Sequence, residues 1–173
     1  AVVSLVIVSH SSKIAEGVQD LVNQVTQGKV AVMAAGAFSE DTLGTHYDLV
    51  KHALDAADSA DGTLVLADLG SAVMTAEMVL EDMPPARRRR ILLCEAPLVE
   101  GAVAAAAQIA AGASLDEAAA EARGALMPKV TQLGARPGPH PSPDMPNWDA
   151  QALIAVSHPL GLHAGPASLF VQA

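Results

Sequence analysis

Apolar and polar positions alternate along this chain in blocks that predict strands and helices in turn. An apolar, β-branched run over residues 2–8 is typical of a buried strand, and the runs over 30–34, 63–67 and 91–94 repeat that pattern. Between the first two runs, apolar residues recur at helical spacing, namely Ile14, Val18, Leu21, Val22 and Val25. Strands that alternate with helices predict an α/β domain with a parallel sheet and helices on its faces.

The later helices carry start and stop signals. Thr45 can cap a second helix, and an alanine-rich helix is expected over about 99–111. Ser114, with Glu117 three residues later, matches a capping box at the start of a last helix. Pro128 is expected to kink or interrupt that helix, because proline cannot donate a helical hydrogen bond.

The pattern changes after Leu133. Residues 134–149 hold five prolines and no apolar periodicity, which predicts a stiff, extended linker. The expected organisation is therefore a domain over 1–133, a linker over 134–149 and a further segment over 150–173. That last segment is too short to fold alone.

Composition narrows the classes of function. The net charge of −9 argues against a nucleic-acid partner, because phosphate neutralisation needs clustered lysine and arginine. The only basic cluster, residues 87–90, is typical of a solvated loop that enters a strand. The single cysteine, Cys94, lies in an apolar run and fits a reducing compartment. With neither a leader pattern nor an apolar run of about 18 residues, we expect a cytoplasmic protein without a membrane partner.

The most informative single position is His10. It ends the first apolar run and is followed at once by Ser11, Ser12 and a helical pattern, which places it on a strand-to-helix turn. In an open α/β sheet these turns line the ligand crevice, and the next helix offers free N–H groups to an anion. A neutral imidazole there is suited to accept a phosphoryl group. The alternative is a solvated histidine in a surface loop.

Polar and glycine residues at the other strand ends are expected at the same edge of the sheet. Asp68 is the natural partner to fix the tautomer of His10, although it could instead cap a helix. Candidate backbone or hydroxyl donors to phosphoryl oxygens are Ser9, Ser11, Gly36, Gly44, Thr45, Gly70 and Ser71. For Gly44, Thr45, Gly70 and Ser71, an ordinary loop or cap role explains the pattern equally well. His46, His52, His140 and His158 carry less weight.

Several familiar site patterns are absent from the sequence. No Cys/His or His/carboxylate spacing predicts a metal site, and no Gly-x-Ser-x-Gly turn, P-loop or kinase signature occurs. We therefore expect no metal and no cofactor, and any phosphoryl group has to arrive from another protein.

Four linked motifs, over residues 6–11, 34–36, 66–72 and 96–102, resemble the mannose-type IIA family. Within that family they are similar to the phosphotransferase subunit of phosphoenolpyruvate-dependent dihydroxyacetone kinases, in order over about residues 2–133. The resemblance implies a doubly wound, mostly parallel sheet with helices on both faces and a homodimer. His10 would be the phosphohistidine, and Asp68 would match the acid that assists it.

The resemblance also implies partners. The chain would take a phosphoryl group from an HPr-type donor onto His10 and pass it to ADP held in the nucleotide-binding subunit of the kinase. Residues 161–168 are in turn similar to the start of an HPr-like domain, incomplete here, in which His163 would be a second phosphohistidine. Gly165 stands where that pattern has an arginine.

Other functions remain open at this point. A mannose-type IIA component of a sugar-transport phosphotransferase system would use the same chemistry with another acceptor. A non-catalytic regulatory binding module of the same fold would use the phosphoryl state as a signal. A flavin- or nucleotide-binding domain is disfavoured, because the helix starts lack a glycine-rich fingerprint.

Overall fold

A computed structural model of the chain describes residues 2–37 and 43–134. Residues up to Leu126 form one compact unit, and helix α7 (Met127–Gln132) belongs to a second unit that is described by itself. None of the helices in the described residues is both long and apolar enough to cross a membrane.

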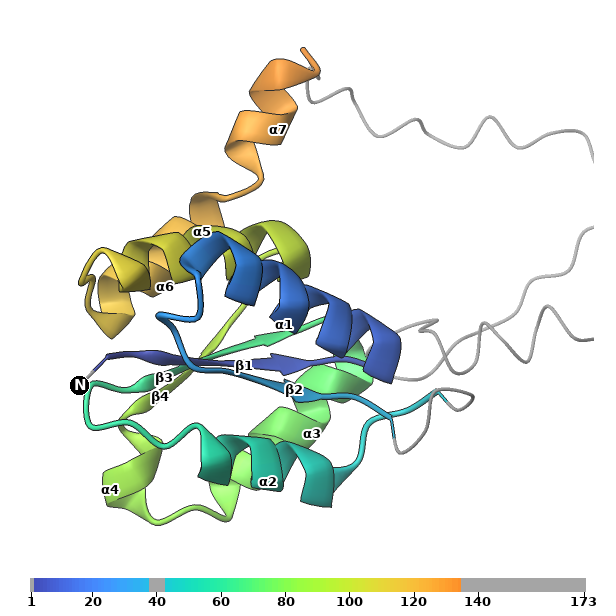
Figure 1. Cartoon of the computed structure of the whole chain (residues 1–173). Helices are drawn as coiled ribbons and strands as arrows, with labels where there is room; N and C mark the ends of the chain where they lie inside the picture. Colours follow the sequence, from blue (N-terminus) through green and yellow to red (C-terminus); the bar gives the residue numbers. More distant parts are fainter. Residues whose placement is uncertain (1, 38–42, 135–173) are drawn as a thin grey trace, which may run out of the picture. The chain divides into compact units, whose positions relative to one another are not determined.

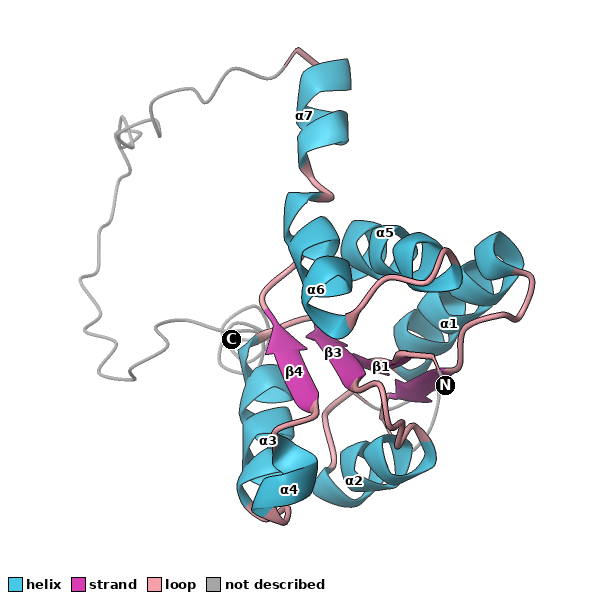
Figure 2. Ribbon diagram, turned by 90° about the vertical axis from the view of Figure 1, so that its left-hand side faces the viewer, coloured by secondary structure: helices cyan, strands magenta, loops and turns pink. Residues whose placement is uncertain are grey.

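The centre of the first unit is a four-stranded sheet in the order β2-β1-β3-β4. Its strands are β1 (Ser4–Val8), β2 (Val32–Ala35), β3 (Thr63–Ala67) and β4 (Ile91–Cys94). Every pairing is parallel, as the alternating pattern predicts (Figure 2). Parallel neighbours need crossover connections, and here each crossover contains a helix.

Helices cover both faces of this sheet (Figure 1). One face carries α1 (Ser12–Thr26), α5 (Leu98–Ala110) and α6 (Leu115–Gly124). The other carries α2 (Tyr47–Ala56) and α3 (Gly70–Glu81), with the four-residue α4 (Pro85–Arg88) before β4. The doubly wound α/β architecture is thus confirmed.

Side chains of β1 alternate between two apolar cores. Leu5 and Ile7 pack under α1 and α5, whereas Val6 and Val8 pack under α2 and α3, and all four are fully buried. Burying such a side chain contributes roughly 1.5–3 kcal/mol, so the central strand anchors both cores. The structure therefore fixes the end of β1, where His10 follows, with little freedom.

Three local predictions need correction. The inner face of α1 is formed by Ala15, Val18 and Val22, while the predicted positions Ile14, Leu21 and Val25 are 39–49% exposed. Thr45 does not cap α2, because His46 occupies the N-cap position. Arg87 is only partly solvated, with its side chain 21% exposed: its guanidinium donates to the Leu54 carbonyl oxygen at 2.7 Å and pairs with Asp55.

The end of the described chain follows the prediction more closely. The Ser114 and Glu117 capping box is present at the start of α6. Helix α6 ends at Gly124 and α7 begins at Met127, so the helical run is interrupted just before Pro128. Cys94 is 4% exposed, as expected.

The strand order places a topological switch point at the carboxyl ends of β1 and β3. Helix α1 leaves β1 toward one face, and α3 leaves the neighbouring β3 toward the other. The two connections therefore diverge at this edge, which is where ligands bind in open α/β sheets. The residues that follow β1 and β3 are Ser9 and Asp68.

Candidate functional site

The carboxyl edge of the sheet brings His10 and Asp68 into direct contact. The Nδ1 atom of His10 lies 2.8 Å from Oδ1 of Asp68, and the two side chains are 18% and 15% exposed. Asp68 directly follows β3 and His10 lies two residues after the end of the adjacent strand β1, so the backbone fixes their spacing. The hydrogen bond between the Asp68 N–H and the Val8 carbonyl oxygen, at 3.1 Å, extends the β1–β3 register up to the site.

Asp68 receives hydrogen bonds at both carboxylate oxygens. Oδ2 accepts from the Ser9 hydroxyl at 2.7 Å and from the His10 backbone N–H at 2.9 Å, and Oδ1 accepts from the Leu69 N–H at 2.6 Å as well as from His10. Burial by itself would raise the pKa of Asp68. The donors of His10, Ser9 and Leu69 outweigh burial and hold that pKa below its usual value. The carboxylate is therefore ionised at neutral pH.

An ionised Asp68 determines which nitrogen of His10 carries the proton. A carboxylate without a proton can only accept, so Nδ1 must donate to it. In the neutral ring, Nε2 then keeps its lone pair. The Ser71 hydroxyl contacts Nε2 and, on this assignment, donates to it. His10 thus presents a nucleophilic nitrogen on the side of the ring that faces away from Asp68.

Two helix starts lie close to His10 along the chain or in space. Helix α3 begins at Gly70, and its second residue, Ser71, contacts Nε2; helix α1 begins at Ser12, two residues after His10, and neither helix has a side-chain cap. The first N–H groups of a helix have no intrahelical partner, and the helix dipole is positive there. An anion at His10 would therefore meet N–H donors and a favourable field from both helices.

The predicted donors do not all face the imidazole. Ser71 contacts it and Gly70 begins the same helix, whereas Ser9 is fully buried behind Asp68. The Ser11 N–H donates to the Ser9 hydroxyl oxygen at 3.1 Å. The Thr45 hydroxyl lies 3.3 Å from the Ser71 carbonyl oxygen and 3.0 Å from the Thr75 hydroxyl, so it contacts α3 rather than the ring.

Gly36 and Gly44 hold backbone segments together around the site. A Cβ atom on Gly36 would lie 2.3 Å from Cα of Ser12, so a side chain there would collide with the start of α1. The Gly44 N–H donates to the His10 carbonyl oxygen at 2.9 Å, and Gly44 has a φ of +146°. Sequence reasoning proposed both glycines as phosphoryl donors and missed these backbone contacts. His163 lies outside the described residues.

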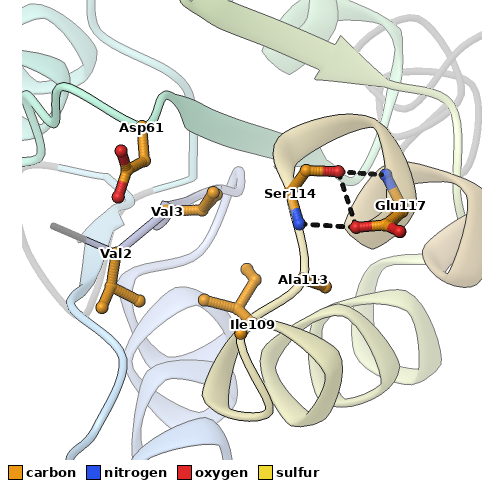
Figure 3. A pocket seen from close by; sticks show the side chains of 8 residues that line it. Val2, Val3, Asp61, Ile109, Ala113, Ser114 and Glu117 are labelled. Atoms are coloured by element: carbon orange, nitrogen blue, oxygen red, sulfur yellow. Dashed lines mark hydrogen bonds between the residues drawn. The ribbon is translucent and has the colours of Figure 1, made fainter.

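The structure also contains a hollow far from His10. Val2, Asp61, Ile109 and Ser114 are among the residues that line about 370 Å³ at the opposite, amino-terminal edge of the sheet (Figure 3). Ser114 and Glu117, on one wall, bond to each other in the capping box. Within residues 2–37 and 43–134 no His, Cys, Asp or Glu side chains gather into a group that could hold a metal ion. The site at His10 is a better candidate for the functional site than this hollow, because it combines a nucleophile, an orienting acid and helix starts.

Comparison with known proteins agrees with this geometry. The family model described as "PTS system fructose IIA component" matches residues 4–119. The chain belongs to this family. The chain is also similar to phosphoryl donor subunits of phosphoenolpyruvate-dependent dihydroxyacetone kinases. The subunit from Pantoea ananatis is 38% identical over 99% of this chain and 38% of the relative. The Escherichia coli K12 subunit is 38% identical over 98% of this chain and 37% of the relative.

A shorter relative and a solved structure also match the chain. A subunit from Listeria innocua, of dihydroxyacetone kinase 1, is 38% identical over 61% of this chain and 80% of its own length. The crystal structure of EF1359, a protein of unknown function, aligns with a TM-score of 0.65 and 30% identity over 71% of this chain and 94% of that one. The IIA resemblance predicted from the four motifs is confirmed. The chain spans less than two fifths of the Pantoea and Escherichia relatives.

Proposed function

We propose that this chain is a phosphohistidine carrier and that Nε2 of His10 holds the phosphoryl group. The observation that carries the proposal is the position of His10, which is held by Asp68 at Nδ1 while Nε2 faces Ser71 between two uncapped helix starts. The names of the relatives, phosphoryl donor subunits, support a carrier role.

Phosphoryl transfer onto His10 involves this site and a phosphorylated donor protein. The lone pair of Nε2 attacks the phosphorus of a phosphohistidine on an HPr-type protein, in line with the donor's N–P bond. A new N–P bond forms on His10, and the electron pair of the broken bond returns to the donor imidazole. The Nδ1 proton remains on His10, hydrogen-bonded to Asp68.

Several groups would stabilise the charge that reaches His10. The Ser71 hydroxyl contacts Nε2 in the resting site and can turn to donate to a phosphoryl oxygen. The N–H groups of Ser12, Gly70 and Ser71 lie in the first turns of α1 and α3, whereas the Ser11 N–H is already bonded to the Ser9 oxygen. Preorganised donors of this kind contribute most of the catalysis in phosphoryl transfer.

The acceptor in this proposal is ADP bound in the nucleotide-binding subunit of a dihydroxyacetone kinase. A β-phosphate oxygen of ADP attacks the phosphorus on His10, the N–P bond breaks, and its electron pair returns to Nε2. ATP is thereby regenerated in the partner, and dihydroxyacetone does not enter this site. The support is the 38% identity to donor subunits of such kinases.

The remaining proposals concern assembly and the rest of the chain. We assign the carrier domain to 1–133, a linker to 134–149 and an incomplete HPr-like segment with His163 to 150–173, in a cytoplasmic homodimer. In the described part of the chain, β4 pairs only with β3, so its outer edge is open to another strand. Half-buried Ile91, Leu92 and Leu93 on β4 support a dimer contact there. Light scattering of the full chain tests the dimer.

The direct test is transfer of labelled phosphate from phosphoenolpyruvate, through the general donor proteins, to the full chain. We compare the wild type with His10→Ala, His163→Ala and, as a matched control, His52→Ala, which removes an exposed histidine of α2. Loss of label in His10→Ala alone supports the carrier. An unlabelled wild type contradicts it and favours the non-catalytic regulatory module.

A second arm of the same experiment distinguishes the dihydroxyacetone kinase role from the sugar-transport role. The labelled chain is mixed with a dihydroxyacetone kinase nucleotide-binding subunit and ADP, or with the membrane component of a mannose-type sugar transporter. Labelled ATP supports the kinase role. Transfer to sugar through the transporter supports the sugar-transport alternative, to which the name of the matching family, a fructose IIA component, lends weight.

A further inference from the structure

Ser9 connects the start of helix α1 to the carboxylate that holds His10. Its side chain is 0% exposed, so a phosphoryl group on His10 cannot reach it. Its oxygen accepts the Ser11 N–H at 3.1 Å, and its hydroxyl proton is directed at Oδ2 of Asp68, 2.7 Å away. The hydroxyl therefore accepts one hydrogen bond and donates another, which fixes its orientation.

We propose that Ser9 is a positioning residue that selects the reactive tautomer of His10 by locking the rotation of the Asp68 carboxylate. Oδ2 is occupied by the Ser9 hydroxyl and the His10 N–H, which leaves Oδ1 for the imidazole. The expected effect of Ser9 on phosphoryl transfer rests on the proposed function. The expected effect of Ser9 on the His10 tautomer does not, because it concerns the unphosphorylated chain.

The consequence of losing the hydroxyl follows from the four donors on Asp68. Without Ser9, Oδ2 keeps a single donor, the His10 backbone N–H, and the Ser11 N–H loses its acceptor. The carboxylate is then held less firmly in the plane that meets Nδ1. When the carboxylate at Nδ1 is held loosely, the imidazole populates both neutral tautomers. In the tautomer protonated at Nε2, that nitrogen has no lone pair with which to attack phosphorus.

A purely structural role for Ser9 would have a different signature. The hydrogen bond from the Ser11 N–H to Ser9 forms a side-chain turn two residues long, which could serve only to stabilise the β1–α1 connection. Removing such a turn lowers the melting temperature but leaves the ring of His10 unchanged. The tautomer of the His10 ring therefore distinguishes a positioning role of Ser9 from a purely structural one.

The test measures the ¹⁵N chemical shifts of the His10 ring nitrogens in the full chain, at a pH at which the ring is neutral. We compare the wild type with Ser9→Ala, Ser9→Thr and Ser9→Val. Threonine and valine place the same volume at position 9 and differ in the hydroxyl, so this pair remains informative if Ser9→Ala fails to fold. Ser4→Ala is the matched control, because it removes another buried serine hydroxyl, at the other end of β1, that contacts Thr63 rather than Asp68.

The wild type, Ser9→Thr and Ser4→Ala are expected to show one tautomer, protonated at Nδ1. Ser9→Ala and Ser9→Val are expected to show mixed tautomers and to accept labelled phosphate about tenfold more slowly. Wild-type shifts in Ser9→Ala or Ser9→Val, or equally mixed shifts in Ser9→Thr, overturn the inference. If the wild type accepts no phosphate, the proposed function fails, and the shifts still decide the role of Ser9.

Discussion

Nδ1 of His10 lies 2.8 Å from Oδ1 of Asp68, although the two residues are 58 positions apart in the chain. Each follows the end of one of two neighbouring parallel strands, β1 and β3, at the point where the helical connections diverge. The contact is therefore a product of the sheet order. Because the carboxylate faces Nδ1, Nε2 is the nitrogen left for chemistry.

Asp68→Asn should nearly abolish transfer without removing volume. The oxygen of the amide is expected to face the two donors at the Oδ2 position, Ser9 and the His10 N–H, which turns the NH₂ group toward Nδ1. The ring must then carry its proton on Nε2. We expect the rate of phosphoryl transfer to fall on the order of 10²- to 10⁴-fold, as in other sites where an imidazole is held in the wrong tautomer.

The control for the transfer rate of Asp68→Asn is Asp61→Asn, which changes an exposed aspartate at the opposite edge of the sheet. The control should retain wild-type transfer. A wild-type rate in Asp68→Asn would refute the orienting role of the carboxylate.

Ser71→Ala should slow transfer while leaving the fold intact. The variant removes the hydroxyl at Nε2, which is the group best placed to donate to a phosphoryl oxygen. A hydrogen bond to a charged group contributes about 1.5–3 kcal/mol, so we expect a decrease of roughly 10- to 100-fold in the transfer rate. Thr75→Ala, one turn further along α3, removes a hydroxyl that bonds the Ser71 carbonyl oxygen instead, and it should have a smaller effect. Equal rates for Ser71→Ala and wild type would show that the contact has no role.

Gly36→Ala should destabilise the fold. The added Cβ would lie 2.3 Å from Cα and 2.7 Å from N of Ser12, both backbone atoms that cannot move aside without displacing α1. We expect a loss of about 1–3 kcal/mol in the free energy of unfolding, measured by urea denaturation. Gly17→Ala is the opposite case, because a Cβ in the exposed middle of α1 meets nothing within 4 Å. That control should gain about 0.5–1 kcal/mol, and a Gly36→Ala variant as stable as wild type would contradict the close approach.

Acid should destabilise the protein partly through Asp68. Its pKa is lowered in the folded chain from the ordinary value of 3.8, because hydrogen bonds to the carboxylate outweigh the effect of burial. A depressed pKa contributes stability above the unfolded value, and that contribution is lost as the pH falls through the folded value. The free energy of unfolding of the wild type should therefore decrease below about pH 4 more steeply than that of Asp68→Asn. Parallel curves would contradict the assignment.

The sequence was sufficient for the architecture and for the two central residues. Apolar runs of β-branched residues alternate with helical patterns, and His10 and Asp68 stand within two residues of the ends of two of those runs. In a parallel sheet that position implies the carboxyl edge, whatever the details of packing. Prediction of His10 and Asp68 as neighbours thus depended only on strand order.

The details that could not be predicted depend on contacts between distant segments. Ile14, Leu21 and Val25 fit a helical stripe as well as the buried residues do, and only the packing of α1 against β2 and α5 decides which face is inside. The contact of Gly36 with Ser12 and the bond from Ser9 to Asp68 likewise depend on backbone placement to within a fraction of an ångström.

The position of the phosphoryl group on the imidazole tests the central claim most directly. The full chain is labelled with ¹⁵N-histidine, phosphorylated by the general donor proteins and analysed by ³¹P–¹⁵N NMR. The account predicts one phosphohistidine, at Nε2 of His10, with the Nδ1 proton still present and bonded to Asp68. A phosphoryl group on Nδ1, or on another histidine while His10 stays unmodified, would contradict it.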